Sequence, residues 1–128
     1  MATLQHPTAV RNSIADHVVD KIDAGGSAGT LKFFTSNGGT LLATLTFSAT
    51  AFGAASNGTA TAAAITPDTN TTAGTVAWFE VQDSTGTTIF EGDVTSDDVG
   101  TGSIQLSSVD LGSGDTLSVS SLTYQAPN

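Results

Sequence analysis

The chain has 128 residues and a mass of 12.8 kDa, the size of one domain with a single hydrophobic core. Twelve acidic residues against three basic ones give a net charge of −9, which argues against binding to nucleic acid or to an anionic membrane. The absence of cysteine excludes disulfides, thiolate chemistry and cysteine-ligated metal centres.

Small residues dominate the composition, because Thr, Ser, Gly and Ala together make up just over half of the chain. We therefore expect a thin core in which backbone pairing carries much of the order. Neither a secretory signal nor a run of apolar residues long enough to cross a membrane is expected. We predict a flexible segment at residues 1–7 and a single domain over residues 8–126.

Residues 8–24 are predicted to form the one helix, with Thr8 as its N-cap and Gly25-Gly26 as its stop. Apolar side chains recur at every fourth position and form a stripe that contains Val10, Ile14, Val18 and Ile22. The three aspartates of the segment fall outside this stripe. Such an amphipathic helix lies on the protein's own sheet or, alternatively, docks on a partner.

From Thr30 onward the apolar period changes to two, which is typical of β-strands. Residues 30–36 and 40–48 are predicted to form a hairpin around Asn37-Gly38-Gly39, because these residues tolerate positive φ. One face of the second strand is expected to be buried and contains Leu41, Ala43, Leu45 and Phe47. The Ala-rich residues 59–65 predict a weaker strand, since alanine has low β-propensity.

A second hairpin is predicted from residues 74–83 and 87–94, joined by a turn at 84–86. Both faces of its first strand carry large apolar groups, which predicts a central strand that is at least partly covered on each face. The two faces contain Ala77, Phe79 and Val81 on one side, and Val76, Trp78 and Glu80 on the other.

The remaining sequence predicts a loop at 96–102 and strands at 103–111 and 116–124, with a turn at 112–115. Leu122 is out of phase with the preceding alternation, which indicates a bulge near residues 120–121. Seven to eight short strands with one N-terminal helix indicate a mainly β fold. We expect an antiparallel β-sandwich, jelly-roll-like in arrangement.

Residues able to carry catalysis are scarce. His6 and His17 are the only side chains that could act as a general base near neutrality. The G-x-S-x-G spacing occurs once, at residues 25–29, and a predicted strand follows it instead of the helix that a catalytic strand-to-helix turn requires. His6 falls in the predicted flexible segment and His17 on the helix surface. We therefore predict no catalytic residues and no enzymatic activity.

Metal and cofactor sites are not expected either. The closest oxygen donors are Asp68-Thr69-Asn70 and Asp97-Asp98, but neither pair continues into a calcium loop, so turn chemistry is the favoured interpretation. The glycine-rich residues 25–29 precede a strand and lack the lysine of a phosphate-binding loop. Two triplets match the glycosylation pattern, Asn57-Gly58-Thr59 and Asn70-Thr71-Thr72, and without an export signal they are interpreted as coincidence.

Aromatic residues divide into core and surface candidates. Phe33, Phe47 and Phe79 are predicted to lie in the core. A platform that stacks on sugar rings is an alternative use for three others, Trp78, Phe90 and Tyr124. For Trp78, burial under the helix or at an oligomer contact is favoured over ligand stacking.

The overall pattern resembles a group of small bacteriophage virion proteins encoded among head genes. The resemblance covers most of residues 8–126 and is carried by RNSIADHVVDKIDAGG, GTLKFFTS, LLATLTFSATAFGAASNGTATA, AGTVAWFEVQDSTGTTIFEGDV and SGDTLSVSSLTYQAP. It implies a head decoration or cement protein that binds the assembled shell by protein–protein contacts. A tail- or fibre-associated module and a carbohydrate-binding sandwich remain the alternatives.

This resemblance implies partners, a location and an interface. The implied partners are the major capsid protein and other copies of the chain, with a trimer as the expected oligomer and with no nucleic acid or membrane. The implied location is the outer surface of the virion, after assembly in the host cytoplasm. The expected interface residues are apolar and comprise Val10, Ile14, Val18, Ile22, Val76, Trp78 and Tyr124.

Overall fold

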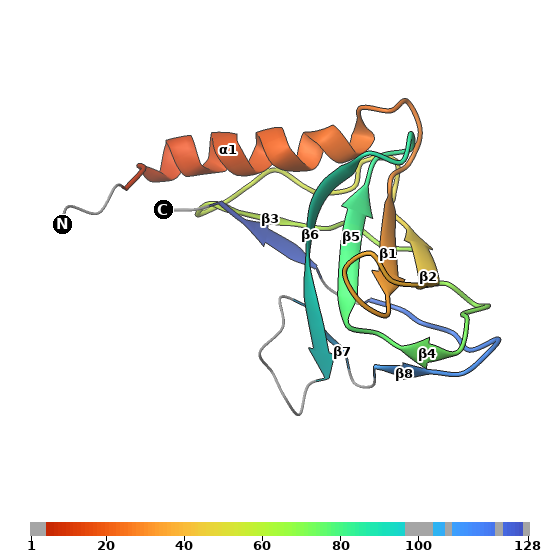
Figure 1. Ribbon diagram of the computed structural model, residues 1–128. Coiled ribbons are helices and arrows are strands. Elements are labelled where there is room, and N and C mark those ends of the chain that lie inside the picture. The colour runs from red at the N-terminus through yellow and green to blue at the C-terminus, as the bar shows by residue number, and fades with distance from the viewer. Residues whose placement is uncertain (1–4, 97–103, 107–108, 120–121, 127–128) are drawn as a thin grey trace.

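The computed structural model describes residues 5–96, 104–106, 109–119 and 122–126. These residues form one helix and nine short strands, shown in Figure 1. The elements are α1 (Thr8–Asp20), a 3-10 turn (Lys21–Asp23), β1 (Thr30–Phe34), β2 (Leu41–Thr46), β3 (Thr59–Thr61), β4 (Gly74–Thr75), β5 (Trp78–Gln82), β6 (Thr88–Ser96), β7 (Ile104–Leu106), β8 (Asp110–Leu111) and β9 (Thr123–Gln125).

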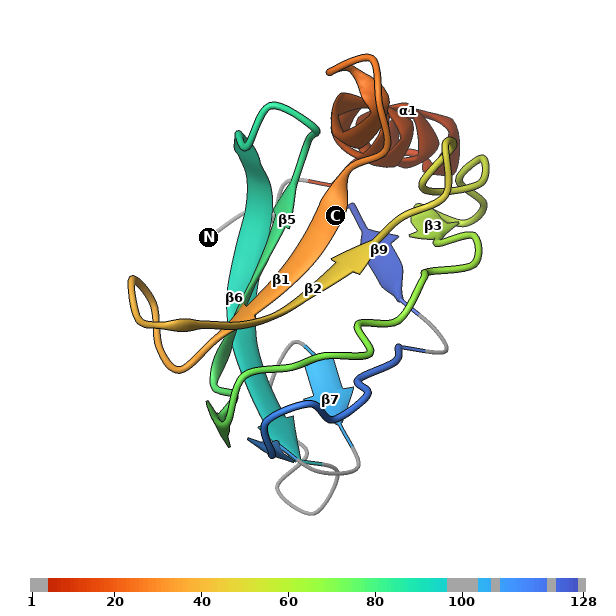
Figure 2. The same cartoon turned by 90° about the vertical axis from the view of Figure 1, so that its right-hand side faces the viewer.

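The strands form one five-stranded sheet, in the order β2-β1-β5-β6-β7, and two ladders, β3-β9 and β4-β8. Every pairing is antiparallel except that of β6 with β7. Figure 2 shows α1 and the β3-β9 ladder facing the five-stranded sheet across the core. The predicted mainly β fold with one helix and antiparallel sheets is thus confirmed, and the layering is consistent with a β-sandwich.

The first predicted hairpin is confirmed, with Gly38 at a φ of +79° in its turn. Its predicted faces are partly wrong, because Leu42 is buried while Leu41 is 40% exposed. The cause is a β-bulge: Phe33 pairs with Ala43 whereas Phe34 pairs with Leu41, so the alternation changes phase within β2. Leu41 therefore shares the face of Phe34 instead of the core face.

The second hairpin is confirmed as β5 and β6, and β5 is the middle strand of the five, as predicted. Residues 74–83 do not form one strand, however, because β4 pairs with β8 while β5 lies in the large sheet. Val76 lies between the two strands and is buried, so it does not share the half-buried environment of Trp78.

Three other predicted strands are shorter than the sequence pattern indicated. The 59–65 strand is reduced to β3, and the 103–111 segment is divided between β7 and β8, which belong to different sheets. Of residues 116–124, only the end belongs to β9, and Leu117 makes an isolated bridge with Asp68. Ser96, the first residue of the predicted 96–102 loop, is the last residue of β6. The rest of that loop and the predicted bulge at 120–121 lie outside the described residues.

The predicted N-cap is wrong by one position. Thr8 is the first residue of α1, and Pro7 occupies the N-cap position, where its carbonyl accepts the Arg11 N–H at 3.0 Å. A proline cannot supply a side-chain cap, and none is present. The α-helix ends at Asp20 and tightens into the 3-10 turn, and Gly26 then adopts a φ of +87°.

The buried face of the helix is rotated from the predicted stripe. Each step of four residues advances about 40° around a helix, so Val10 and Ile22 point about 120° apart. Val10 is 43% exposed whereas Ile22 is fully buried. The row that enters the core is Ala15, Val19 and Ile22. The helix therefore packs on its own chain, as the first of the two interpretations predicted.

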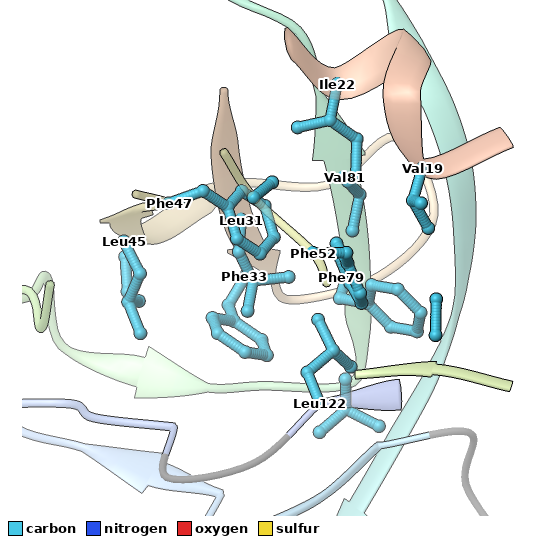
Figure 3. Packing of buried hydrophobic residues seen from close by; sticks show 14 of the residues in the cluster. Val19, Ile22, Leu31, Phe33, Leu45, Phe47, Phe52, Phe79, Val81 and Leu122 are labelled. Carbon is cyan, nitrogen blue, oxygen red and sulfur yellow. The ribbon is translucent and has the colours of Figure 1, made fainter. Parts of the chain in front are cut away.

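The core lies between the two layers, as Figure 3 shows. The predicted core residues Phe33, Phe47 and Phe79 are all buried. Leu31 and Val81, on β1 and β5, complete its centre beneath the helix. Burial of each such side chain contributes roughly 1.5–3 kcal/mol, which must offset the entropy of ordering a chain with many small residues.

Candidate interaction surface on the outer face of the sheet

The residues considered for catalysis and metal binding are dispersed. His6 is half-buried and His17 is exposed on α1. Among the described residues, no three His, Asp or Glu side chains come close enough to hold a metal ion. Asp97 and Asp98 lie outside the described residues.

Asp68 has a structural role in which both carboxylate oxygens take part. Oδ1 accepts the N–H of Asn70 at 2.8 Å, which confirms the predicted turn chemistry. Oδ2 accepts the N–H of Thr44 at 2.8 Å, on the open edge of β2. This carboxylate therefore occupies a backbone donor that an edge strand would otherwise present to another chain.

The neighbouring segment closes more of the same edge. Thr46 and Thr66 exchange backbone hydrogen bonds of 3.2 and 2.8 Å, and the N–H of Thr72 donates to the Leu42 carbonyl at 2.8 Å. Pairing of an additional strand with β2 is thus blocked along much of its length. A partner that approaches this end of the sheet meets the face of the strands instead of their edge.

The proposed sugar platform is not assembled. Phe90 pairs with Val81 on the core face of the sheet and packs against Tyr124, with ring centroids 5.1 Å apart. Trp78 is three residues from Val81 on the same strand and faces the opposite side. The three aromatic residues therefore lie on two different faces and cannot stack on one ligand.

The seven predicted interface residues fall into three groups. Ile22 and Val76 are buried in the core, so their assignment to an interface is wrong: their surface is already used within the chain. Tyr124 is half-buried against Phe90. The residues that retain exposed surface elsewhere are Val10, Ile14 and Val18 on the helix, and Trp78 on the sheet.

Trp78 lies on the outer face of the five-stranded sheet, and the strand register shows which residues surround it. It pairs with Phe34 of β1, and Phe34 pairs with Leu41 of β2. These three apolar side chains, which we call the apolar row, therefore lie side by side across three strands. Leu41 is exposed and the other two are half-buried. Trp78 is thus not beneath the helix, because α1 packs on the core side of the sheet.

The indole of Trp78 carries an unsatisfied donor. Its Nε1 is buried and has no hydrogen-bond partner among the described residues. A buried donor without an acceptor costs about 1–3 kcal/mol relative to a paired one. The apolar row therefore includes a donor that the described part of the chain leaves unpaired.

Acidic residues adjoin the apolar row. Trp78 pairs on its other side with Asp93 of β6, and the next row of the face places Lys32 opposite Glu80 and Glu80 opposite Glu91. Asp93 and Glu91 are exposed. One basic and three acidic side chains thus surround the apolar row on β1, β5 and β6, and the face has the same sign of charge as the whole chain.

Of the three residues of the apolar row, only Trp78 was predicted from the sequence as an interface residue. The period-two pattern of residues 30–36 already places Phe34 on the face opposite Leu31 and Phe33, which was a usable signal. Leu41 could not be found in this way, because the bulge in β2 reverses the side that its alternation predicts.

A second feature of the surface is a shallow depression of about 170 Å³ near the end of the helix, lined by Asp23, Gly26, Ser27, Ala28 and Ala49. It is smaller than the roughly 300–1,000 Å³ of most ligand pockets. The Asp23 carboxylate is also engaged, since it accepts the N–H of Ala51 at 3.1 Å.

No helix among the described residues is long and apolar enough to span a membrane. In comparisons with known proteins, no family model, curated protein or solved structure matches this chain.

Proposed function

We propose that this chain is a bacteriophage head decoration protein that binds the assembled shell through the outer face of its five-stranded sheet. The apolar row of Leu41, Phe34 and Trp78 carries the proposal, because it places two aromatic side chains and one exposed leucine on a solvent-facing sheet. Stable interfaces have such an apolar centre within a polar rim, and aromatic residues are their usual anchors.

The charge of the face selects the kind of partner. Glu80, Glu91 and Asp93 outnumber Lys32 around the apolar row, and the chain carries a net charge of −9. A second copy docked face to face would bring like charges together. The complementary partner is a protein surface with an apolar centre and lysine or arginine at its margin, and we assign this role to the major capsid protein.

A capsid shell offers many equivalent binding sites, so each contact with the decoration protein can be weak. A protein that binds only the assembled lattice stabilises it by mass action, and many equivalent sites multiply a small contact energy. An acceptor on the shell would also satisfy the Trp78 indole N–H once the side chain rotates toward it. The resemblance of the sequence to small virion proteins supports the same role, in contact with neighbouring copies of the chain on the outer surface.

The experiment that tests this function uses heads from a phage genome in which the reading frame for this chain is deleted. Purified protein is added to these heads, and the bound fraction is measured by sedimentation and located by cryo-electron microscopy. We expect saturation at a fixed ratio to the capsid protein and a regular lattice of added density. Density at a single vertex or along a tail would assign the chain to the tail, and absence of binding would exclude the proposal.

A further inference from the structure

Two Asn-Gly pairs occur in the chain, and the structure treats them differently. Asn37-Gly38 lies in the turn between β1 and β2, and Asn57-Gly58 lies directly before β3. We infer that Asn37 is a site of spontaneous deamidation in the folded protein, whereas the fold protects Asn57. This inference is independent of the proposed function.

The reaction needs only the chain and water. The backbone nitrogen of the glycine attacks the side-chain carbonyl carbon of the preceding asparagine, a carbon–nitrogen bond forms, and the side-chain amide leaves as ammonia. Water then opens the succinimide ring at either carbonyl, giving aspartate or isoaspartate. The step depends on a glycine nitrogen that is accessible and free to leave its hydrogen bonds, because the nitrogen must lose its proton to attack.

At Asn57 the attacking nitrogen is engaged. The N–H of Gly58 donates to Oδ1 of Asn12 at 2.7 Å, and Gly58 is buried. Asn57 and Gly58 have φ values of 53° and 75°, as in a type I′ turn, and Ser56 and Thr59 close this turn with reciprocal hydrogen bonds of 2.9 and 3.0 Å.

The guanidinium of Arg11 covers the same glycine. A Cβ built on Gly58 would lie 2.7 Å from the Arg11 Cζ, which shows how closely the two groups approach. Attack by Gly58 therefore requires breaking the Asn12 hydrogen bond and displacing part of α1. Local opening of this kind has a free-energy cost that the exposed turn does not have.

At Asn37 neither restraint is present. Asn37 and Gly38 are both exposed. The bonds that close the turn do not involve the Gly38 N–H: the Gly39 N–H donates to the Ser36 carbonyl at 2.9 Å, and two bonds of 3.0 Å join Thr35 and Thr40. No acceptor for the Gly38 N–H is found among the described residues. A Cβ built on Gly38 meets no atom within 4 Å, so no neighbouring group covers this glycine as Arg11 covers Gly58.

The product would alter the end of the candidate interaction surface. The turn directly follows Phe34 and precedes Leu41, so deamidation adds a negative charge beside the apolar row. The isoaspartate product also inserts an additional methylene into the backbone of the hairpin. Newly made and aged protein would thus present different surfaces at this position.

The test follows both asparagines in one sample. The folded protein is incubated in mildly alkaline buffer, digested, and analysed by mass spectrometry for the mass increase that replacement of amide by carboxyl produces. We expect Asn37 to convert at least about tenfold faster than Asn57, a ratio equivalent to about 1.4 kcal/mol. Equal rates, or faster conversion of Asn57, would overturn the inference.

Two controls separate the fold from the sequence. In concentrated urea the two Asn-Gly pairs should convert at similar rates, since only structure distinguishes them. Asn12→Ala should accelerate conversion of Asn57 by several-fold and leave Asn37 unchanged, whereas Asn12→Asp, which keeps an acceptor, should protect Asn57. A rate difference that persists in urea would contradict the structural explanation.

Discussion

The carboxylate of Asp16 accepts a hydrogen bond from the backbone N–H of Ala55, with 2.7 Å between Oδ1 and N. Asp23 and Asn12 make the equivalent contacts with Ala51 and Gly58. Three polar side chains of the helical segment thus hold residues 51–58 along the helix. This segment lacks a continuous ladder of its own, so these acceptors satisfy backbone donors that strand pairing leaves free.

Removal of the Asp16 carboxylate should therefore destabilise the fold. We expect Asp16→Ala to lower the free energy of unfolding by about 1–3 kcal/mol, because the half-buried Ala55 N–H loses a charged acceptor. Asp16→Asn should cost less, since an amide oxygen can still accept. Asp20→Ala removes an exposed carboxylate from the same helix and should stay within about 0.5 kcal/mol of the wild type. Urea denaturation measures all three, and equal losses for Asp16→Ala and Asp20→Ala would contradict this role.

A glycine controls how closely the helix end approaches the sheet. A Cβ on Gly29 would lie 2.5 Å from the Gln82 carbonyl oxygen and would also meet the Ile22 Cγ2. Gly29→Ala should cost roughly 1–3 kcal/mol through overpacking. Gly53→Ala is the matched control, because Gly53 is exposed and its nearest contact for a Cβ is 3.8 Å away. Thermal unfolding should show a clear loss for the first variant only, and similar melting temperatures would exclude the steric explanation.

The turn between β5 and β6 should contribute stability that depends on pH. The Thr85 hydroxyl donates to Asp83 at 2.7 Å, and the Thr87 N–H donates at 3.0 Å, which holds the pKa of Asp83 below its ordinary 3.8. The folded protein thus binds this proton less readily than the unfolded chain. The contribution is complete above the ordinary pKa and is lost as pH falls through the lowered value.

Carbon-13 NMR of the Asp83 carboxyl measures this directly. The titration midpoint should lie below 3.8 in the wild type and should move upward in Thr85→Ala, which removes the largest cause of the shift. An unchanged midpoint in that variant would show that the hydroxyl does not stabilise the charged form.

The turns could be predicted from neighbouring residues alone. The features that were not predicted depend on contacts between residues that are distant in the sequence. Asn37-Gly38 marked a hairpin because the adjacent residues alone favour positive φ. The exposure of Leu41 depends instead on which residue of β1 it pairs with, and a single bulge moves its side chain from the core face to the outer face. Asp16 lies 39 residues before Ala55, so no local pattern could show that its carboxylate faces the chain instead of the solvent.

The same reason limited the prediction of the site. Trp78 was identifiable as a large side chain on a strand with two apolar faces. The residues that surround Trp78 could be found only from the order of the strands, because Phe34 lies beside it through the pairing of β1 with β5, and 43 residues separate these two strands. The predicted apolar stripe of the helix was wrong because residues spaced four apart advance about 40° around the helix at each step and so do not stay on one face.

A charge placed in the apolar row should weaken binding to the shell without unfolding the chain. Leu41→Asp changes an exposed residue, and we expect its affinity for decoration-deficient heads to fall at least about tenfold, or about 1.4 kcal/mol. Thr46→Asp adds the same charge to an exposed position farther along β2, and it should bind within about threefold of the wild type. Sedimentation with heads compares the two, and equal affinities would argue against the apolar row.

Hydroxyl-radical footprinting of the chain, free and bound to decoration-deficient heads, tests the central claim most directly. Mass spectrometry assigns each oxidation to a peptide of this chain, so aromatic residues of the shell do not interfere. We predict that oxidation of Trp78 and Phe34 falls several-fold on binding, while Tyr124, against the core face of the sheet, is unchanged. Equal oxidation of Trp78 in the free and bound protein, or protection confined to Val10 and Val18 on the helix, would contradict the account.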